Sequence, residues 1–455
     1  MRTSTAHSPS RLLLFIIFAV VLAQTVFPLS QSQRAGTVIV LTIGLWASGR
    51  LPEYYTALLF FLLCVIGQVV PLDILFSGFA SPAVWLFFSG AVLGMAINHT
   101  GLGAYLARCI APLLARSVYH ALAGSMLLGS GLMFIMPSAM GRILLLLPIV
   151  AALAQSLGYQ REDRAYRGML LGMVFATFLP AFTVLPANVP NNILIGMMDS
   201  LFANSPSYLQ YLVLHFPLLG LLKMLILWAI LCIFYRDKAP LRQPLEAAPL
   251  SRSAKQLALL LTGVLGLWLS EDIHGISSAW VGMIGALYCL WPGSGLLGEQ
   301  PIRRMNLEPL FYVAAIVGMG VVAFHSGLAT QMVDALLHIA PLSPKEHATN
   351  FATIAGLSSL TGILATLASI PAILTPMGTT LSEASGLSVD AIAMIQVLGF
   401  STVWLPYQAP PLMIAIQSGY VSHRDVTHLC LILAVISVVV LWPLDYLWWQ
   451  LLGYL

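Results

Sequence analysis

Charge is the scarcest property of this sequence. Asp, Glu, Lys and Arg make up 8% of its 455 residues, whereas hydrophobic residues make up 59%. A soluble globular chain carries about 25% charged residues, so this chain cannot cover a soluble surface, and its hydrophobicity excludes intrinsic disorder. The net charge of +3 gives no reason to expect nucleic acid as a partner. We therefore expect an integral membrane protein that contacts the lipid bilayer.

The sequence also lacks the spacings typical of metal-binding and disulfide-rich proteins. Its five cysteines form no CxxC pair, and its ten histidines form no HExxH motif. The cysteines lie within or beside apolar stretches, as small buried hydrophobic residues do. No metal site and no cofactor are predicted.

Acidic residues are expected to be absent from the membrane interior. The 17 Asp and Glu residues fall in predicted loops or near the ends of apolar stretches. Carboxylate proton relays and all-carboxylate cation sites are therefore not expected. Any coupling cation would be held by carbonyl, hydroxyl and amide oxygens.

Long apolar runs are abundant, and a membrane span needs about 20 apolar residues. Hydropathy predicts eleven spans, near 12–29, 36–50, 54–71, 83–103, 168–198, 208–235, 256–270, 276–292, 309–328, 391–418 and 427–450. Two longer stretches, near 118–157 and 346–385, are each broken in the middle and are interpreted as re-entrant hairpins. The alternative is two ordinary spans in each stretch. The predicted fold is an all-α polytopic membrane protein.

The distribution of basic residues predicts the orientation. With the N-terminus in the cytoplasm, only Arg34 and Lys345 of the 20 Lys and Arg residues fall on the outer side, as the positive-inside rule requires. We expect a multi-pass protein of the inner cell membrane. The predicted units are N-terminal spans (1–53), a first repeat (54–235), a cytoplasmic linker (236–255) and a second repeat (256–455).

The two repeats share three short patterns in the same order, with offsets of 226, 228 and 220 residues. The matching pairs are Gly94 and His99 with Gly320 and His325, Ser138 and Pro148 with Thr366 and Pro376, and Leu185–Pro190 with Leu405–Pro410. An odd number of spans separates equivalent points, so the repeats run in opposite senses. Inverted repeats are typical of secondary transporters, whose substrate sites lie where broken helices from both halves meet.

Prolines are predicted to break one span in each half, because each proline removes a backbone donor and clashes with the preceding turn. They are Pro186 and Pro190 in 168–198, and Pro406, Pro410 and Pro411 in 391–418. Amide side chains beside them offer donors and acceptors for a substrate. These candidates are Asn188, Asn191, Asn192 and Gln408.

Arg142 is the most distinctive single residue, because a charge inside a span costs about 2.5–3.5 kcal/mol on insertion scales. It lies four residues after Ser138 and shares its helix face. A guanidinium, a hydroxyl and a helix N-terminus suit an anionic substrate such as a carboxylate. The alternatives are a snorkelling or a structurally paired arginine, and Lys223 is expected to snorkel.

These motifs resemble those of the divalent anion/sodium symporter family, which has eleven spans, two re-entrant hairpins and inverted repeats. Ser138 keeps the serine of the first hairpin motif, whereas Ala139 and Met140 replace its Asn and Thr, and Thr366 keeps a hydroxyl in the second hairpin. The resemblance implies a sodium site near Ser138, Asn192 and Thr366, weakened by these replacements, and a homodimer. Arg142 would supply positive charge where sodium binding has weakened.

The leading hypothesis is therefore a secondary active transporter of small anions, either dicarboxylates and other organic acids or sulfate. A cation/proton antiporter and a metalloid-oxyanion carrier of the same superfamily are alternatives. A polytopic membrane enzyme is an alternative of another class. Its candidate acid–base groups would be Asp272 with His274, and His423 with Asp425.

Overall fold

The computed structural model describes residues 27–48, 51–103, 105–106, 116–134, 139–236, 249–339, 342–364 and 366–455, together with residues 19, 22 and 109. Every regular element within these residues is a helix. The predicted all-α fold is therefore confirmed. Most of the first predicted span, 12–29, and residues 237–248 of the predicted linker lie outside the described residues.

Most of the predicted uninterrupted spans correspond to apolar helices. They are α2 (Gln31–Ser48), α3 (Glu53–Ile66), α6 (Pro82–Thr100), α14 (Arg252–Leu269), α16 (Ser278–Leu290) and α18 (Glu308–His325). The structure adds short helices between them, namely α4 (Leu72–Leu75), α5 (Ser77–Ala80), α15 (Glu271–His274), α17 (Pro301–Arg304) and α19 (Leu328–Ile339). α2 and α3 pack against each other and against α18, while α6 packs against α16. These contacts bring the start of the chain against its second half.

Each predicted hairpin region contains helices on both sides of a break. In the first, α8 (Val118–Gly131) and the 3-10 turn η1 (Leu132–Phe134) precede α9 (Ala139–Ser156). In the second, α20 (His347–Leu364) precedes α21 (Ser369–Leu374), η5 (Thr375–Met377) and α22 (Gly378–Ser385). That these helices enter the membrane and return to the same side stays a prediction.

Two helices are interrupted by non-helical or 3-10 backbone. α10 (Arg164–Phe178) is followed by η2 (Pro180–Thr183), η3 (Leu185–Ala187) and α11 (Val189–Phe202). α23 (Val389–Ser401) is followed by η6 (Pro406–Gln408) and α24 (Pro410–Gln417). The first interruption thus begins several residues before Pro186.

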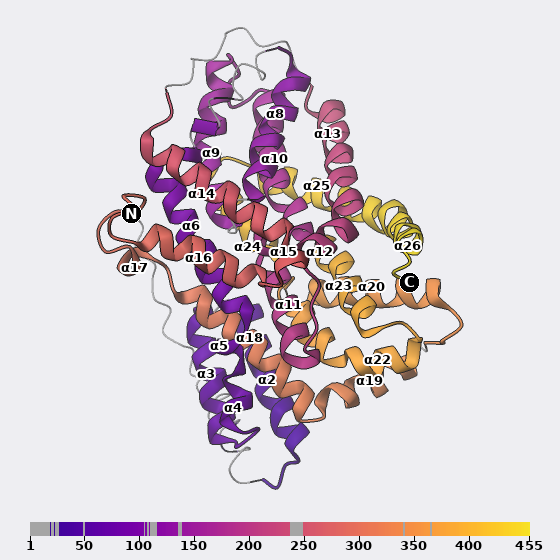
Figure 1. Ribbon diagram of the computed structural model, residues 1–455. Helices are drawn as coiled ribbons and strands as arrows, with labels where there is room; N and C mark the ends of the chain where they lie inside the picture. Colours follow the sequence, from indigo (N-terminus) through magenta and orange to yellow (C-terminus); the bar gives the residue numbers. More distant parts are fainter. Residues whose placement is uncertain are drawn as a thin grey trace.

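Two long helices contain a π-helical segment, a rare form that often marks functional sites. α12 (Tyr208–His215) continues through the π-helix η4 (Phe216–Leu222) into α13 (Lys223–Phe234). α25 (His423–Ile436) continues through the π-helix η7 (Ser437–Leu441) into α26 (Trp442–Leu451). Figure 1 shows α8, α9, α10 and α13 at one end of the molecule and α2, α3 and α4 at the other.

Glycines allow the hairpin helices to approach the interrupted helices closely. A Cβ atom on Gly129 of α8 would lie 2.6 Å from the carbonyl oxygen of Met173 in α10. A Cβ atom on Gly399 of α23 would lie 2.7 Å from the carbonyl carbon of Ser358 in α20. Each hairpin therefore packs its first helix against the first part of its own interrupted helix, with no room for a side chain at the crossing.

Within the described part of the chain, six helices are long and apolar enough to cross a membrane, or up to seven if the bent pair Ser369–Ser385 and Val389–Ser401 is one span. The two helices of that pair meet at 117°. Shorter apolar helices add candidates, so the number of eleven spans stays a prediction. The helices nevertheless fall where the hydropathy places them.

Candidate functional site

Arg142 lies on α9 with no solvent exposure, and its guanidinium bridges the first interruption. Its Nη2 donates hydrogen bonds to the carbonyl oxygens of Thr177, at 3.0 Å, and Ala187, at 3.3 Å, and its Nη1 donates to the oxygen of Ala187 at 3.4 Å. Thr177 lies in the last turn of α10, and Ala187 ends η3. Carbonyl groups at the end of a helix lack an N–H partner within the helix, so a break exposes carbonyl groups of this kind. The snorkelling alternative for Arg142 is therefore wrong, and its partners include main-chain carbonyls.

Asn191 stabilises the same interruption from its other side. Its Nδ2 donates to the carbonyl oxygens of Ala181 at 2.9 Å and Val184 at 2.8 Å, and its side chain is fully buried. The amide that was predicted to contact substrate thus holds the turn between η2 and α11. Substitution of Asn191 would disturb the interruption itself.

The side chain of Asn188 makes a hydrogen bond through its oxygen but not through its nitrogen. Its Oδ1 accepts a hydrogen bond of 2.9 Å from the backbone N–H of Val189 and so caps the N-terminus of α11. Its Nδ2 is buried and has no hydrogen-bond partner among the described residues. Asn192, one turn into α11, is also buried, and its Oδ1 has no partner in that part of the chain. A buried donor without a partner is costly unless a ligand or water satisfies it.

Gln408 repeats this arrangement in the second half. Its Oε1 accepts hydrogen bonds of 2.8 Å from the backbone N–H groups of Trp404 and Leu405, while its Nε2 is buried and unpaired within the residues described. Its carbonyl oxygen accepts a hydrogen bond of 3.4 Å from the N–H of Leu367, at the break between α20 and α21. Beside Leu367, the half-buried Thr366 shares a hydrogen bond of 3.1 Å with Ser369. The second break and the second interruption are therefore in direct contact.

The prolines have a different role from the predicted kink. Each lies in the first turn of a new helical segment, where a missing N–H costs nothing. Pro186 is the second residue of η3, Pro190 lies in α11, Pro406 begins η6, and Pro410 and Pro411 begin α24. The interruptions consequently end in the N-termini of α11 and α24, which present free N–H groups and a partial positive charge.

Helix packing interlocks the two halves. α11, which follows the first interruption, packs against α21 of the second hairpin region, and α24, which follows the second, packs against α9 of the first. α9 carries Arg142. Ser138 lies outside the described residues, so the predicted contact between Ser138 and a ligand and the sodium site that includes it stay predictions.

Lys223 is a buried cation whose placement the sequence interpretation missed. Its side chain is 2% exposed, and its Nζ donates a hydrogen bond of 2.6 Å to the carbonyl oxygen of Ser401, the last residue of α23. The prediction that Lys223 snorkels is wrong, because its helix turns this face toward the second interruption rather than toward lipid.

Asp445 corrects a second expectation. It lies near the end of the apolar segment His423–Leu451 and is fully buried, so an acidic residue at a span end can still lie inside the protein. Lys223 and Asp445 lie 222 positions apart, within the range of the offsets between the two repeats. This spacing could have identified the two residues as equivalent positions of the two repeats.

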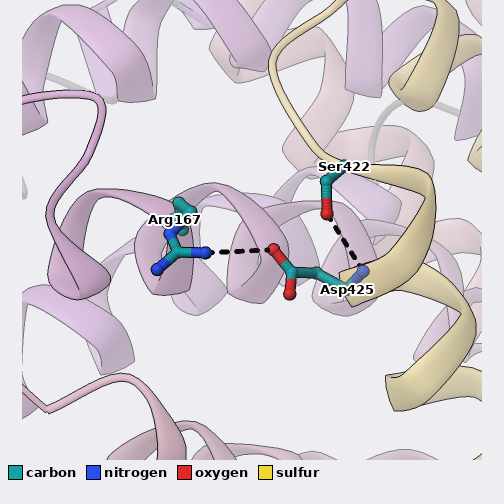
Figure 2. Close-up of polar contacts among 3 residues, drawn as sticks. All are labelled: Arg167, Ser422 and Asp425. Atoms are coloured by element: carbon teal, nitrogen blue, oxygen red, sulfur yellow. Dashed lines mark hydrogen bonds and ion pairs between the residues drawn. The ribbon is translucent and has the colours of Figure 1, made fainter.

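An ion pair joins the first turns of α10 and α25. The Nη1 of Arg167 lies 3.7 Å from the Oδ2 of Asp425, whose backbone N–H donates to the Oγ of Ser422 at 3.0 Å (Figure 2). These residues line a pocket of about 220 Å³ together with Arg161, Tyr166 and Tyr420. Asp425, a candidate acid–base group of the enzyme hypothesis, is thus engaged by an arginine.

The two histidines among the acid–base candidates have structural partners. The Nδ1 of His423 shares a hydrogen bond of 3.3 Å with Thr427 in the next turn of α25. The Nε2 of His274 lies 2.8 Å from the carbonyl oxygen of Leu267 at the end of α14. Both histidines therefore have local contacts that fit helix-end roles.

Comparison with known proteins identifies the family. The model of the sodium:sulfate symporter transmembrane region matches residues 6–455. The chain belongs to this family. This bears out the resemblance to divalent anion/sodium symporters and makes the protein a multi-pass membrane protein and a secondary anion transporter.

Relatives of this sodium:sulfate symporter family member are distant. An L-tartrate/succinate antiporter of Escherichia coli (strain K12) is 25% identical over 400 residues, which cover 82% of this chain and 79% of the relative. An uncharacterized transporter of Haemophilus influenzae is 23% identical over 456 residues, 95% of each chain. A membrane protein of Cupriavidus necator is 22% identical over 415 residues, 85% of this chain and 78% of the relative.

A solved structure shares the fold. The crystal structure of the Alcanivorax borkumensis YdaH transporter matches 98% of this chain and 99% of its own with a TM-score of 0.53 and 16% sequence identity. At this sequence identity, the match supports a shared fold and nothing about function.

Proposed function

We propose that this transporter carries small dianions, dicarboxylates foremost, by alternating access, and that Arg142 supplies a fixed positive charge in place of a coupling sodium ion. The observation that carries the proposal is the position of the guanidinium. It lies on the carbonyl oxygens of Thr177 and Ala187, at the break of α10. In transporters with broken helices, such carbonyls and helix C-termini coordinate the coupling cation.

The anion itself is assigned to the other ends of the interruptions. The N-termini of α11 and α24 carry partial positive charge. The Nδ2 of Asn188 and the Nε2 of Gln408, which have no partner among the described residues, add one donor at each. Asn188 is 6% exposed and Gln408 is fully buried, so neither donor is saturated by bulk water. Two carboxylates of one substrate would take one helix N-terminus each. Thr366 and Asn192 would complete the site from neighbouring turns.

The relatives support a dicarboxylate. The Escherichia coli relative is an L-tartrate/succinate antiporter, which exchanges these two dicarboxylates. A cation that is part of the protein cannot dissociate, so its charge offsets the substrate equally on both sides of the membrane. That arrangement favours exchange of one dianion for another over sodium-driven accumulation.

The cellular setting of the proposal follows from the charge pattern. The transporter would lie in the inner membrane with its N-terminus in the cytoplasm, and it would work as a homodimer, as its family resemblance implies. The positive-inside distribution of Lys and Arg supports the orientation.

Exchange in proteoliposomes tests the proposal. Purified protein is reconstituted into vesicles loaded with unlabelled succinate, and uptake of labelled succinate is measured with sodium and with choline as the external cation. With equal pH on both sides of the membrane, we expect rapid uptake that is driven by internal dicarboxylate and is the same in sodium and choline. Competition by tartrate and sulfate then ranks the substrates. Strict sodium dependence would overturn the fixed-charge proposal, and absence of exchange with every dianion would overturn the substrate class.

A further inference from the structure

Lys223 and Asp445 occupy equivalent places in two long helices. Lys223 is the first residue of α13, directly after the π-helix Phe216–Leu222, and Asp445 lies in the first turn of α26, directly after the π-helix Ser437–Leu441. Both side chains are buried, with 2% and 0% exposure. α26 also contacts the π-helix that precedes Lys223. The two halves thus bring one basic and one acidic group together inside the protein.

The hydrogen bonds of the two groups differ sharply. Lys223 donates to the carbonyl oxygen of Ser401 at 2.6 Å. Both carboxyl oxygens of Asp445 are buried and accept no hydrogen bond from any residue that the structure describes. Asp445 and Lys223 lie on adjoining helical segments, but the pair does not form a salt bridge within 4.0 Å in the described chain. Lys223 therefore donates its hydrogen bond to the C-terminal end of α23 rather than to the carboxyl group of Asp445.

A buried carboxylate without donors is strongly unfavourable, whereas a neutral carboxylic acid in the same place is not. The observed contacts therefore suit a protonated Asp445. Loss of its proton would leave a buried negative charge without a hydrogen-bond donor. The ammonium group of Lys223 could neutralise this charge if it moved from the carbonyl oxygen of Ser401 to the carboxylate.

We propose that Asp445 is a proton-binding site and that Lys223 transmits its protonation state to the second interruption. With a proton on Asp445, Lys223 caps the C-terminus of α23. When the proton leaves, Lys223 moves to the carboxylate and the carbonyl of Ser401 loses its cation. Because α23 leads through η6 into Gln408 and α24, this exchange of partners would alter the proposed anion site. The inference rests on the proposed function and adds proton coupling to it.

Other titratable groups lie on the helices around the pair. Cys430 of α25 is buried, and the buried His215 of α12 stacks edge-on against Trp449, one turn after Asp445 on α26. Neither ring nitrogen of His215 has a partner in the described chain. The other charged or titratable groups of the adjoining helices are Tyr119 and His120 on α8, Arg164, Tyr166 and Arg167 on α10, Tyr208 and Tyr211 on α12, Cys232 on α13, His347 on α20, Asp390 on α23, His423, Arg424, Asp425 and His428 on α25, and Tyr446 on α26. Of the carboxyl groups on these described helices, Asp445 alone is buried.

The test uses proteoliposomes in two modes. Exchange of labelled for unlabelled succinate at equal pH reports the anion cycle, and accumulation under an acidic exterior, with no internal substrate, reports proton coupling. A gradient of one pH unit stores about 1.4 kcal/mol for each proton coupled, equivalent to about tenfold accumulation. We expect the wild type to accumulate succinate under the gradient, and Asp445→Asn to retain exchange but lose accumulation. Asp390→Asn, which changes an exposed carboxylate bonded to Asn204, should accumulate as the wild type does.

A double variant controls for the possibility that a single substitution impairs folding. Lys223→Met with Asp445→Leu removes both charges, and replacing a buried pair by apolar residues is often neutral or stabilising. It should fold and should not respond to the pH gradient. Accumulation by Asp445→Asn or by the double variant at the wild-type level would overturn the proposal, as would a wild type that exchanges succinate but ignores the gradient. Absence of exchange in the wild type would instead overturn the proposed function, and the proton site with it.

Discussion

The Nζ of Lys223 donates a hydrogen bond of 2.6 Å to the carbonyl oxygen of Ser401, the last residue of α23. Arg142 makes the corresponding contact in the first half, 3.0 Å from its Nη2 to the carbonyl oxygen of Thr177 near the end of α10. Thr177 and Ser401 lie 224 positions apart, within the range of offsets between the repeats. Both interrupted helices therefore end on a buried cation. The negative end of the helix dipole and the free carbonyls favour a positive charge there.

Removing the guanidinium should affect both fold and transport. Arg142→Ala leaves the carbonyls of Thr177 and Ala187 without this donor, at about 1–3 kcal/mol for each buried group that loses its partner. We expect loss of succinate exchange with retained expression, and partial recovery in Arg142→Lys, which keeps the charge but not the two-pronged geometry. Thermal unfolding and exchange in choline medium measure both effects. Near-normal exchange by Arg142→Ala would contradict the fixed-charge role.

The unpaired amide donors should matter for substrate affinity more than for stability. Asn188→Asp keeps the oxygen that caps α11, and Asp and Asn are equally good N-caps, so the free energy of unfolding should change by less than about 1 kcal/mol. It replaces the Nδ2 donor by a charged acceptor, however. Because a hydrogen bond to a charged group contributes about 1.5–3 kcal/mol, the KM for succinate should rise at least tenfold.

Gln408→Glu is the matching change in the second half, since its Oε1 contacts with Trp404 and Leu405 can persist. Gln256→Glu, at an exposed position, serves as the control and should leave KM unchanged. If both Asn188→Asp and Gln408→Glu kept the wild-type KM in a folded protein, the anion would not bind at these helix N-termini.

The close crossing of α20 and α23 should tolerate no added methyl group. A Cβ atom at residue 399 would lie 2.2 Å from the Cβ of Ser358. Overpacking of this kind costs about 1–3 kcal/mol, so Gly399→Ala should lower the unfolding temperature of the detergent-solubilised protein. Gly356→Ala is the control on α20, where no atom lies within 4 Å of the new Cβ. It should stabilise the helix by up to about 1 kcal/mol.

The ion pair between Arg167 and Asp425 should contribute little to stability. Its side chains are 43% and 18% exposed, and the nitrogen–oxygen distance is 3.7 Å. Partly exposed pairs contribute about 0–1 kcal/mol. A double-mutant cycle with Arg167→Ala and Asp425→Ala should give a coupling energy in that range, and salt should reduce it further. A coupling of several kcal/mol would mean that the pair is desolvated in the bilayer.

The orientation can be tested without purified protein. Eleven spans with the N-terminus in the cytoplasm place the C-terminus outside, so a fluorescent reporter should work at the N-terminus and a periplasmic phosphatase reporter at the C-terminus. A fusion within the linker 236–255 should report the cytoplasm. Reporters that place both termini on the same side would contradict the eleven-span topology.

The apolar runs determine the helices because a membrane chain must satisfy its backbone hydrogen bonds within each segment. Hydropathy therefore located α6, α16 and α18 closely, and proline chemistry located the interruptions near Pro186 and Pro406. Local signals of this kind do not depend on what packs against them. The sequence also identified Asn188 and Gln408 as equivalent residues, since their spacing follows the repeat.

Tertiary structure decided the partners of the buried charges. The sequence shows that Arg142 and Lys223 lie inside apolar stretches, but not that their donors end on Thr177, Ala187 and Ser401, which are distant in the chain. A carbonyl oxygen has no residue-type signature, so no motif can announce it as the partner of a cation. Asp445 was missed for a related reason. Whether an acid near the end of a span faces water or a buried lysine depends on the rotation of its helix against its neighbours, and packing alone fixes that rotation.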